Sequence, residues 1–161
     1  SGLEWSHENL TKLAGIQKEC KSCKWKVEYL RTECTQKQLR DKIGHQKTFK
    51  QEWELLQRKH WELRAPNELL FCNGKMIIPD CKTEEIFPDG DIISEGKFLR
   101  THLVNSAHRL AHDLQVTRQT LHEDWGVDWP DLEVDLRTQA KQCLHCRGSG
   151  GFYLVPKISQ S

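Results

Sequence analysis

The amino-terminal part of the chain carries hydrophobic residues at helical spacing, separated by charged and polar positions. Ser6 can cap a first helix, because its hydroxyl can accept a hydrogen bond from the first helical turn. The apolar positions of this helix fall three residues apart, at Leu10, Leu13 and Ile16. Longer helices are predicted at about residues 24–43 and 48–63, with Gly44 between them and Pro66 after them. The pattern therefore predicts a helical hairpin.

The pattern changes after Pro66 into two short apolar runs, residues 69–72 and 75–78, that flank Asn73-Gly74. An Asn-Gly pair between apolar runs predicts a β-hairpin, because both central positions of its turn need a positive φ. Residues 79–93 contain Pro88-Asp89-Gly90 and are expected to form a loop.

Helical periodicity returns in the carboxyl-terminal half of the chain. Three helices are expected there, at about residues 95–114, 118–124 and 130–142. Ser94 and Thr117 are the predicted caps of the first two helices, and Pro130 suits the first position of the third. Residues 125–129 are expected to form a turn.

These elements predict a mainly α protein: an amino-terminal helical hairpin, a small β-hairpin, and a metal-stabilised domain of three or four helices. The expected divisions are a basic helical region, a β-hairpin with its linker, a metal-binding domain and a flexible tail. Their ranges are 1–66, 67–93, 94–147 and 148–161.

Composition narrows the classes of partner. The 161 residues are 37% hydrophobic and 29% charged, with a net charge of +1, so no global positive field points to nucleic acid. Between Lys12 and Lys59, however, thirteen Lys or Arg face six Asp or Glu. This local excess fits a solvated helix face, a phosphate-contacting face or a surface for an acidic protein. The sequence shows no 18-residue apolar run and no secretory signal, so neither a membrane span nor secretion is expected.

Two histidines and two cysteines suggest a metal site: His108-x3-His112, then thirty residues, then Cys143-x2-Cys146. A structural zinc ion takes about four nitrogen or sulfur ligands in a tetrahedron. Histidines four residues apart share one face of a helix, and the two cysteines can form a knuckle around one metal. Such a site is full, whereas catalytic zinc keeps one position open. The alternative is a pair of core histidines beside an unrelated knuckle.

Other histidines and cysteines are weaker candidates. His102 could replace His108, His122 is a spare, and His145 is expected to point outward. A second metal site is conceivable in the first block, with ligands Cys20, Cys23, Cys34 and His45, and with His60 nearby. Cys72 and Cys81 are interpreted as packing residues. Seven cysteines cannot all pair within one chain, so metal binding in a reducing, intracellular compartment is favoured over disulfides.

Residues 67–146 resemble the amino-terminal zinc-binding domain of integrases from retroviruses and gypsy-like retrotransposons. The resemblance rests on "SAHRLAHD", "VTRQTLHED" and "VDWPDLEVDLRTQAKQCLHC", and on the upstream "LLFCNGKMIIP". The family usually has a glycine at or soon after the second histidine, whereas here Ala111 and Asp113 flank His112. The resemblance implies a zinc-binding helical fold that mediates multimer contacts and helps to hold DNA ends.

Integrases catalyse in a separate domain that uses three carboxylates and two metal ions. None of the fifteen residues after Cys146 is Asp or Glu, so no enzyme activity is expected of this chain. We expect a non-catalytic zinc module that mediates protein assembly or self-association, with a nuclear location. The alternative is a nucleic-acid-binding part of an integrase or of a domesticated chromatin protein. No small-molecule substrate is expected.

Two pairs of aromatic residues are candidates for the contact surface. Phe49 and Trp53 lie on one stripe of the predicted helical hairpin. Trp125 and Trp129 could either form an exposed face or pack over the metal core.

Overall fold

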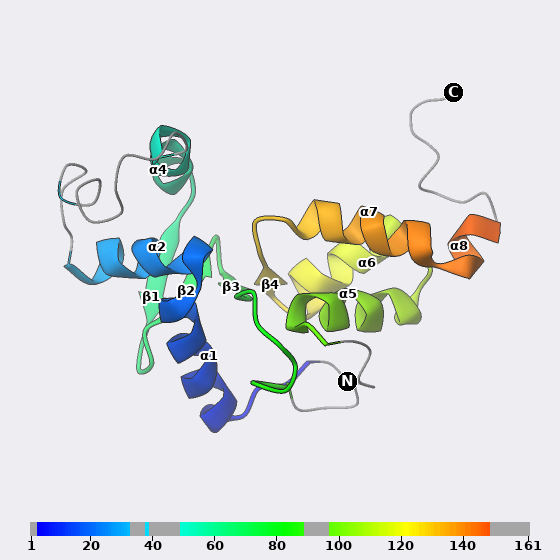
Figure 1. Cartoon of the computed structure of the whole chain (residues 1–161), viewed down its shortest axis with the longest axis horizontal. Helices are drawn as coiled ribbons and strands as arrows, with labels where there is room; N and C mark the ends of the chain where they lie inside the picture. Colours follow the sequence, from blue (N-terminus) through cyan, green and yellow to red (C-terminus); the bar gives the residue numbers. More distant parts are fainter. Residues whose placement is uncertain (1–2, 33–37, 39–48, 89–96, 149–161) are drawn as a thin grey trace.

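The computed structural model describes residues 3–32, 38, 49–88 and 97–148. The protein is mainly helical and contains a small four-stranded sheet, as the sequence predicts in coarse terms. The strands β3 and β4 lie between the amino-terminal helices and the group of helices α5 to α8 (Figure 1).

Three helices are described in the amino-terminal part: α1 (His7–Glu19), α2 (Lys21–Thr32) and α4 (Phe49–Arg58). The predicted cap of α1 is confirmed, because the Ser6 side chain accepts a 3.1 Å hydrogen bond from the Asn9 backbone N–H. Helix α2 begins three residues before the predicted start. The predicted continuation of this helix to residue 43 and the Gly44 turn lie outside the described residues, apart from residue 38.

The sheet has the order β1-β2-β3-β4, formed by β1 (Trp61–Arg64), β2 (Leu69–Cys72), β3 (Lys75–Ile77) and β4 (Val127–Asp128). The first three strands are antiparallel, and β4 pairs with β3 in parallel. The predicted β2–β3 hairpin is confirmed, with φ of 50° at Asn73 and 80° at Gly74.

Two predictions fail at the outer strands of this sheet. Residues 61–63 were expected to be helical, but α4 ends at Arg58, and Trp61 and Leu63 reach the Cys23 core cluster from a strand. Their spacing of two places both side chains on one face of β1. Residues 125–129 were expected to be a turn, but Val127 is fully buried and pairs with Met76. In both segments, pairing with a neighbouring strand determined the secondary structure.

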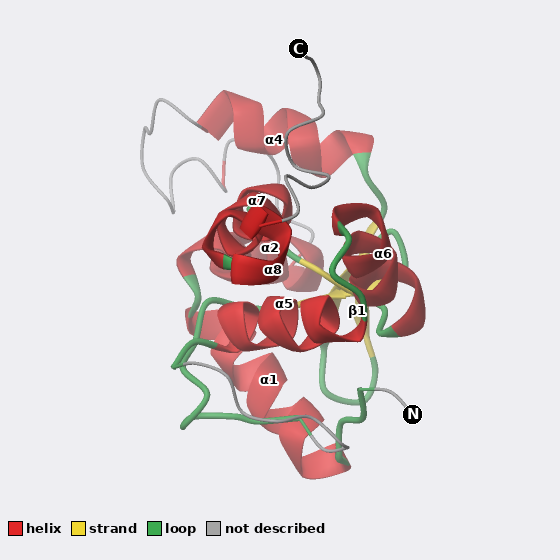
Figure 2. Cartoon of the chain, turned by 90° about the vertical axis from the view of Figure 1, so that its right-hand side faces the viewer, coloured by secondary structure: helices red, strands yellow, loops and turns green. Residues whose placement is uncertain are grey.

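The carboxyl-terminal half contains α5 (Leu99–Leu110), α6 (Leu114–Gln119), η1 (Thr120–Asp124), α7 (Leu132–Gln142) and α8 (Leu144–Gly148). The segment η1 is a single π-helical turn that continues α6. Helices α5, α7 and α8 lie together on the right-hand side of Figure 1, which is the side that faces the viewer in Figure 2.

The limits of these helices differ from the predicted ones. Helix α5 stops at Leu110, because Ala111 is extended, and α7 begins after Asp131 rather than at Pro130. Thr117 is not a cap: Asp113 caps α6 by accepting a 2.9 Å hydrogen bond from the Val116 N–H. The predicted cap Ser94 lies outside the described residues.

The largest core cluster draws on both the amino-terminal and the carboxyl-terminal half of the described chain. It contains Leu13 from α1, Leu69 from β2, Leu103 from α5 and Leu136 from α7. Residues from the expected ranges 1–66, 67–93 and 94–147 therefore share one core, while the division into domains stays a prediction. None of the described helices is long and apolar enough to span a membrane.

Candidate metal centre

The four predicted ligands come from α5, α7 and α8 and from the connection between α5 and α6. His108 lies in the last turn of α5, and His112 lies in the connection to α6. Cys143 is the residue that ends α7, and Cys146 belongs to α8. Their spacing predicted that the two histidines share one helix, but α5 ends at Leu110 and only His108 belongs to it. The extended Ala111, with φ of −159°, turns the chain so that His112 still faces His108.

The ligand atoms of these residues lie within 4.8 Å of one another. His108 Nε2 is 3.0 Å from His112 Nδ1 and 3.3 Å from Cys146 Sγ. Cys143 Sγ is 3.4 Å from His112 Nδ1. Usual zinc–nitrogen and zinc–sulfur bond lengths imply tetrahedral edges of roughly 3.3 to 3.8 Å between ligand atoms. The spacing of the four atoms therefore fits one metal ion of this size.

The site has one buried and one open side. His108 and Cys146 are 3% and 1% exposed, whereas Cys143 is half-buried and His112 is exposed. Two of the candidate ligands are thus buried, and the other two lie on the solvent side of the site. With four protein ligands of the right type, no position is left for a water or a substrate.

Thr117 supports the site from behind His108. Its hydroxyl donates a 2.7 Å hydrogen bond to the Asp113 carbonyl, and its oxygen lies 3.5 Å from His108 Nδ1. A hydroxyl whose proton is used in this way can accept one from Nδ1–H. That arrangement leaves the lone pair of His108 Nε2 facing the other three ligand atoms. The sequence had suggested only a capping role for this threonine.

The local pKa values set the protonation states before a metal binds. Burial, followed by the neighbouring His112 and His145, lowers the pKa of His108 to about 4, so this ring is neutral at pH 7. Burial, followed by the contact with Cys143, raises the pKa of Cys146 to about 11. Metal binding therefore requires that Cys146 lose its proton, whereas the neutral His108 ring can bind a metal without losing one.

Three other histidines of this half differ in their distance from the site. His145 packs against His112, with ring centroids 4.5 Å apart and the ring planes tilted by 43°. His102 is fully buried against the Phe87 ring, and His122 Nε2 lies 3.1 Å from the Asp128 carboxylate. In the part of the chain that the structure describes, none of these three joins the group of four ligand atoms.

The second predicted site is described only in part. Cys20 and Cys23 share a side-chain hydrogen bond, which lowers the pKa of Cys20 and raises that of Cys23. Cys34 and His45 lie outside the described residues, so this second site stays a prediction. His60 is exposed on the surface, 3.6 Å from the Glu62 carboxylate.

Cys72 and Cys81 are buried in core clusters, as expected of packing residues. Burial raises the pKa of both thiols, in the case of Cys81 to about 12. Trp129 is buried in the main core and Trp125 packs against it, so these two side chains pack inward. Trp53 packs edge-on against Tyr29, with ring centroids 5.3 Å apart, and the Phe49 side chain lies outside what is described.

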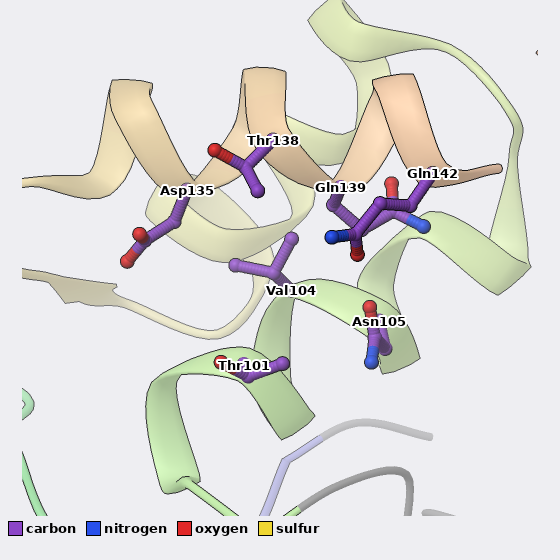
Figure 3. Close-up of a pocket in the computed structure, with 7 residues that line it drawn as sticks. All are labelled: Thr101, Val104, Asn105, Asp135, Thr138, Gln139 and Gln142. Atoms are coloured by element: carbon purple, nitrogen blue, oxygen red, sulfur yellow. The ribbon is translucent and has the colours of Figure 1, made fainter.

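A small pocket lies between α5 and α7, and none of the four candidate ligands lines it (Figure 3). Its lining is formed by Thr101, Val104, Asn105, Asp135, Thr138, Gln139 and Gln142. The carboxylate of Asp135 already accepts a 2.7 Å hydrogen bond from the Trp129 indole N–H. Amides and hydroxyls make up the rest of the polar lining, and this set pairs no nucleophile with a base.

Comparisons with protein-family models, with curated proteins and with solved structures found no match for this chain.

Proposed function

We propose that this protein is a non-catalytic module stapled by one structural zinc ion. The observation that carries the proposal is the convergence of His108, His112, Cys143 and Cys146, with ligand atoms within 4.8 Å of one another. Two nitrogens and two sulfurs are a donor set typical of zinc, and four protein ligands fill its coordination sphere. Bound zinc would tie the α7–α8 corner to the end of α5.

The proposed ancestry is an integrase-type zinc domain. Its support is the His-His-Cys-Cys order and spacing, the hairpin before it and the short motifs of residues 67–146. The helical surroundings of the four ligands agree with that class of domain. By analogy with that class, the module would assemble proteins and would not catalyse a reaction.

Exposed apolar side chains beside the ligands support an assembly role. Leu110 is 68% exposed and Leu144 is 79% exposed. Leu110 lies between His108 and His112 in the sequence, and Leu144 lies between Cys143 and Cys146. Large apolar side chains that are left in solvent near an ordered site often mark a protein contact. We propose a second copy of the chain as the partner, by analogy with the multimers of integrases.

Native mass spectrometry tests the two parts of this proposal separately, because it reports metal content and oligomeric state together. We expect one zinc ion per chain from the His-His-Cys-Cys site and a dimer or higher species. Leu144→Ser should keep the zinc and shift the distribution toward monomer. Val134→Ser changes an exposed apolar position on α7 and is the control. It should keep the zinc and leave the distribution of oligomers unchanged. A zinc-free protein with a retained fold would refute the metal, and a wild-type monomer would refute self-association.

Nucleic-acid binding is the second candidate function, and exposed cations on α2 and at the end of α4 favour it. Lys21, Lys24, Arg58 and Lys59 are exposed. Other cations of the basic region face carboxylates, among them Lys18 at 3.6 Å and Arg31 at 3.3 Å from Glu68. This partial neutralisation leaves fewer charges for phosphates.

The salt dependence of DNA binding distinguishes this candidate from assembly. Phosphate contacts predict an affinity that falls steeply between 50 and 200 mM salt, by about a thousandfold or more if six or more phosphates are contacted. Lys21→Ala with Lys24→Ala should reduce the slope. No binding to duplex or single-stranded DNA at low salt would exclude the nucleic-acid function.

A further inference from the structure

Strand β1 (Trp61–Arg64) forms one edge of the sheet. The order β1-β2-β3-β4 gives it a single neighbour, and no other strand of the described residues pairs with it. Two of its side chains are well exposed, Glu62 at 34% and Arg64 at 47%. A strand at the edge of a sheet presents unpaired backbone N–H and C=O groups, which can pair with a strand from another chain.

The hydrogen bonds at the start of β1 fix which of its backbone groups point outward. The His60 carbonyl accepts a 2.7 Å hydrogen bond from the Asn73 N–H, and the His60 N–H donates a 2.9 Å bond to Asn73 Oδ1. Both groups of His60 therefore point toward the β2 side. In an antiparallel pair this direction alternates from one residue to the next. Glu62 thus directs its backbone groups toward β2, whereas Leu63 directs its N–H and C=O toward the open edge.

The charges of β1 are self-complementary about Leu63. Glu62 and Arg64 lie on the same face of the strand, and within one chain they form a 2.8 Å ion pair. If two copies of β1 pair antiparallel about a two-fold axis through Leu63, Glu62 of each copy faces Arg64 of the other. Parallel pairing in register would instead place like charges side by side, which is unfavourable. The order Glu-Leu-Arg therefore favours antiparallel pairing.

Leu63 suits a position on the two-fold axis. Its outward N–H and C=O would exchange two hydrogen bonds with the same groups of the second copy. The Glu62 and Arg64 pairs then fall at the adjacent positions without backbone hydrogen bonds between the copies, where cross-strand side chains lie closest. The Leu63 side chain is only half-buried against the Cys23 core cluster, so its exposed part can contact the second Leu63.

We propose that β1 is a second self-association surface, at which two copies of the chain pair their sheet edges antiparallel into one continuous sheet. The same patch of both copies forms the contact, so the interface is symmetric and closes as a dimer. A strand of four residues offers few hydrogen bonds, so the pairing should be reversible and dependent on concentration. This surface contains neither Leu110 nor Leu144 nor any candidate zinc ligand, so it can exist or fail independently of the proposed function.

Amide hydrogen exchange measured residue by residue with NMR tests the proposal on the zinc-loaded, full chain. The Leu63 N–H lacks a strand partner in a single copy, whereas the Glu62 N–H faces β2. We expect exchange at Leu63 to slow as the protein concentration rises, by about tenfold when about nine-tenths of the chains are paired. A Leu63 rate that is the same at every concentration would overturn the proposal. A fast constant rate would indicate a free edge, and a slow one would indicate that a segment of the same chain covers it.

Charge reversal tests the register of the pairing. Glu62→Arg and Arg64→Glu each place like charges across the axis, so each variant alone should lose the concentration-dependent protection of Leu63. A mixture of the two variants should regain it, because each chain then carries the charges that complement the other. Both variants should stay folded, since an exposed ion pair contributes little to stability, and circular dichroism checks this. Protection that persists in both single variants would overturn the proposal.

Two further variants serve as controls. Glu8→Arg reverses a charge in the exposed pair with Lys12, away from β1, and should leave the protection of Leu63 unchanged. Leu144→Ser, which tests the assembly surface of the proposed function, should also leave it unchanged. Loss of Leu63 protection in the Leu144 variant would overturn an independent edge interface. Unchanged protection in a Leu144 variant with an unaltered oligomer distribution would refute only the Leu144 surface.

Discussion

Thr117 is a buried residue that contacts Nδ1 of His108, the ring nitrogen that does not face the other candidate ligands. Its hydroxyl is committed to the Asp113 carbonyl, so its oxygen is oriented toward His108 Nδ1. Such a contact selects the tautomer in which the other ring nitrogen can bind a metal. The same threonine is 1% exposed, so water cannot easily replace its hydroxyl.

We predict that Thr117→Val weakens zinc binding by roughly tenfold to a hundredfold, because His108 loses the contact that fixes its tautomer. Valine has nearly the same shape, so the helical content should be retained. Competition with a fluorescent zinc chelator measures the affinity. Thr138→Val, an exposed position on α7, is the control and should bind zinc like the wild type. An unchanged affinity in the Thr117 variant would show that Thr117 does not support the site.

We also predict that His112→Ala and Cys143→Ser each lose the zinc and lower the thermal midpoint. Each removes one of four ligands and leaves the buried His108 and Cys146 without a complete site. Zinc content and thermal unfolding are the two measurements, with Cys72→Ser as a control that should affect packing only. A variant that kept both its zinc and its midpoint would show that the altered residue is not a ligand.

At the scale of elements, one buried amide joins α1 to the sheet. Gln17 is fully buried; its Oε1 accepts from the Leu70 N–H at 2.8 Å, and its Nε2 donates to the Ile77 carbonyl at 2.7 Å. The side chain therefore satisfies backbone groups of β2 and β3 that would otherwise be buried without partners.

We predict that replacing this amide by a hydrocarbon side chain lowers the free energy of unfolding. Gln17→Leu leaves the Leu70 donor and the Ile77 acceptor unpaired, and we expect a loss of about 2–4 kcal/mol in unfolding free energy. Chemical denaturation followed by circular dichroism measures it. Gln119→Leu makes the same change at an exposed position on α6 and should cost less than about 0.5 kcal/mol. Equal losses in the two variants would contradict the role of the buried amide.

An ion pair joins α6 to α7. Arg118 donates to both carboxylate oxygens of Glu133, with Nη2 at 2.7 Å from Oε1. The hydrogen bond from Arg118 lowers the pKa of Glu133 below its ordinary value. The stabilisation is therefore present above that ordinary value and is lost as the pH falls through the folded-state pKa.

We predict that Glu133→Gln lowers the unfolding free energy at pH 7 by up to about 1 kcal/mol, since both partners are partly solvated. The difference from wild type should shrink toward zero as the pH falls below 4. Thermal melts across this pH range measure it, with Glu8→Gln in the exposed pair with Lys12 as a control that should show little effect. A difference independent of pH would assign the loss to packing.

The helices and strands also differ in how far the sequence could predict them. The first helix with its Ser6 cap and the Asn73-Gly74 hairpin follow from local chemistry, and both are present. The strand β4 was missed because its partner β3 lies far earlier in the sequence. The strand β1 was missed because it pairs with β2 and packs Trp61 and Leu63 against the Cys23 cluster, which the local pattern did not indicate. The four ligands were identifiable from residue type and spacing. The supporting role of Thr117 was not, because its contact depends on how α5 and α6 cross.

At the scale of the whole molecule, the end where α8 lies is one end of the described structure, whereas β3 and β4 lie between its two halves (Figure 1). His108 and Cys146 close the end where α5, α7 and α8 meet, whereas Met76 and Val127 join the two halves through the sheet. Loss of the metal should therefore loosen one end of the molecule before the other.

We predict that removing zinc with a chelator increases amide hydrogen exchange most in α8 and in the final turns of α5 and α7. Exchange in β2 should change least, because its partners β1 and β3 and the Gln17 amide do not depend on the metal. Hydrogen–deuterium exchange with mass spectrometry resolves these segments, and adding zinc back should reverse the change. A uniform increase over the chain would contradict this graded response.

The ligands also arrive in a fixed order during synthesis. His108 and His112 leave the ribosome at least thirty residues before Cys143 and Cys146, so the nascent chain first carries only half of the binding site. Two histidines hold zinc weakly, and the sheet residues of β4 must be made before the cysteines appear. A metal ion bound by all four residues could therefore join α5 to α8 only after the residues of β4 have been synthesised. Tight metal binding would then occur only in chains that have been translated through Cys146. Products truncated before Cys143 would fail to retain the ion.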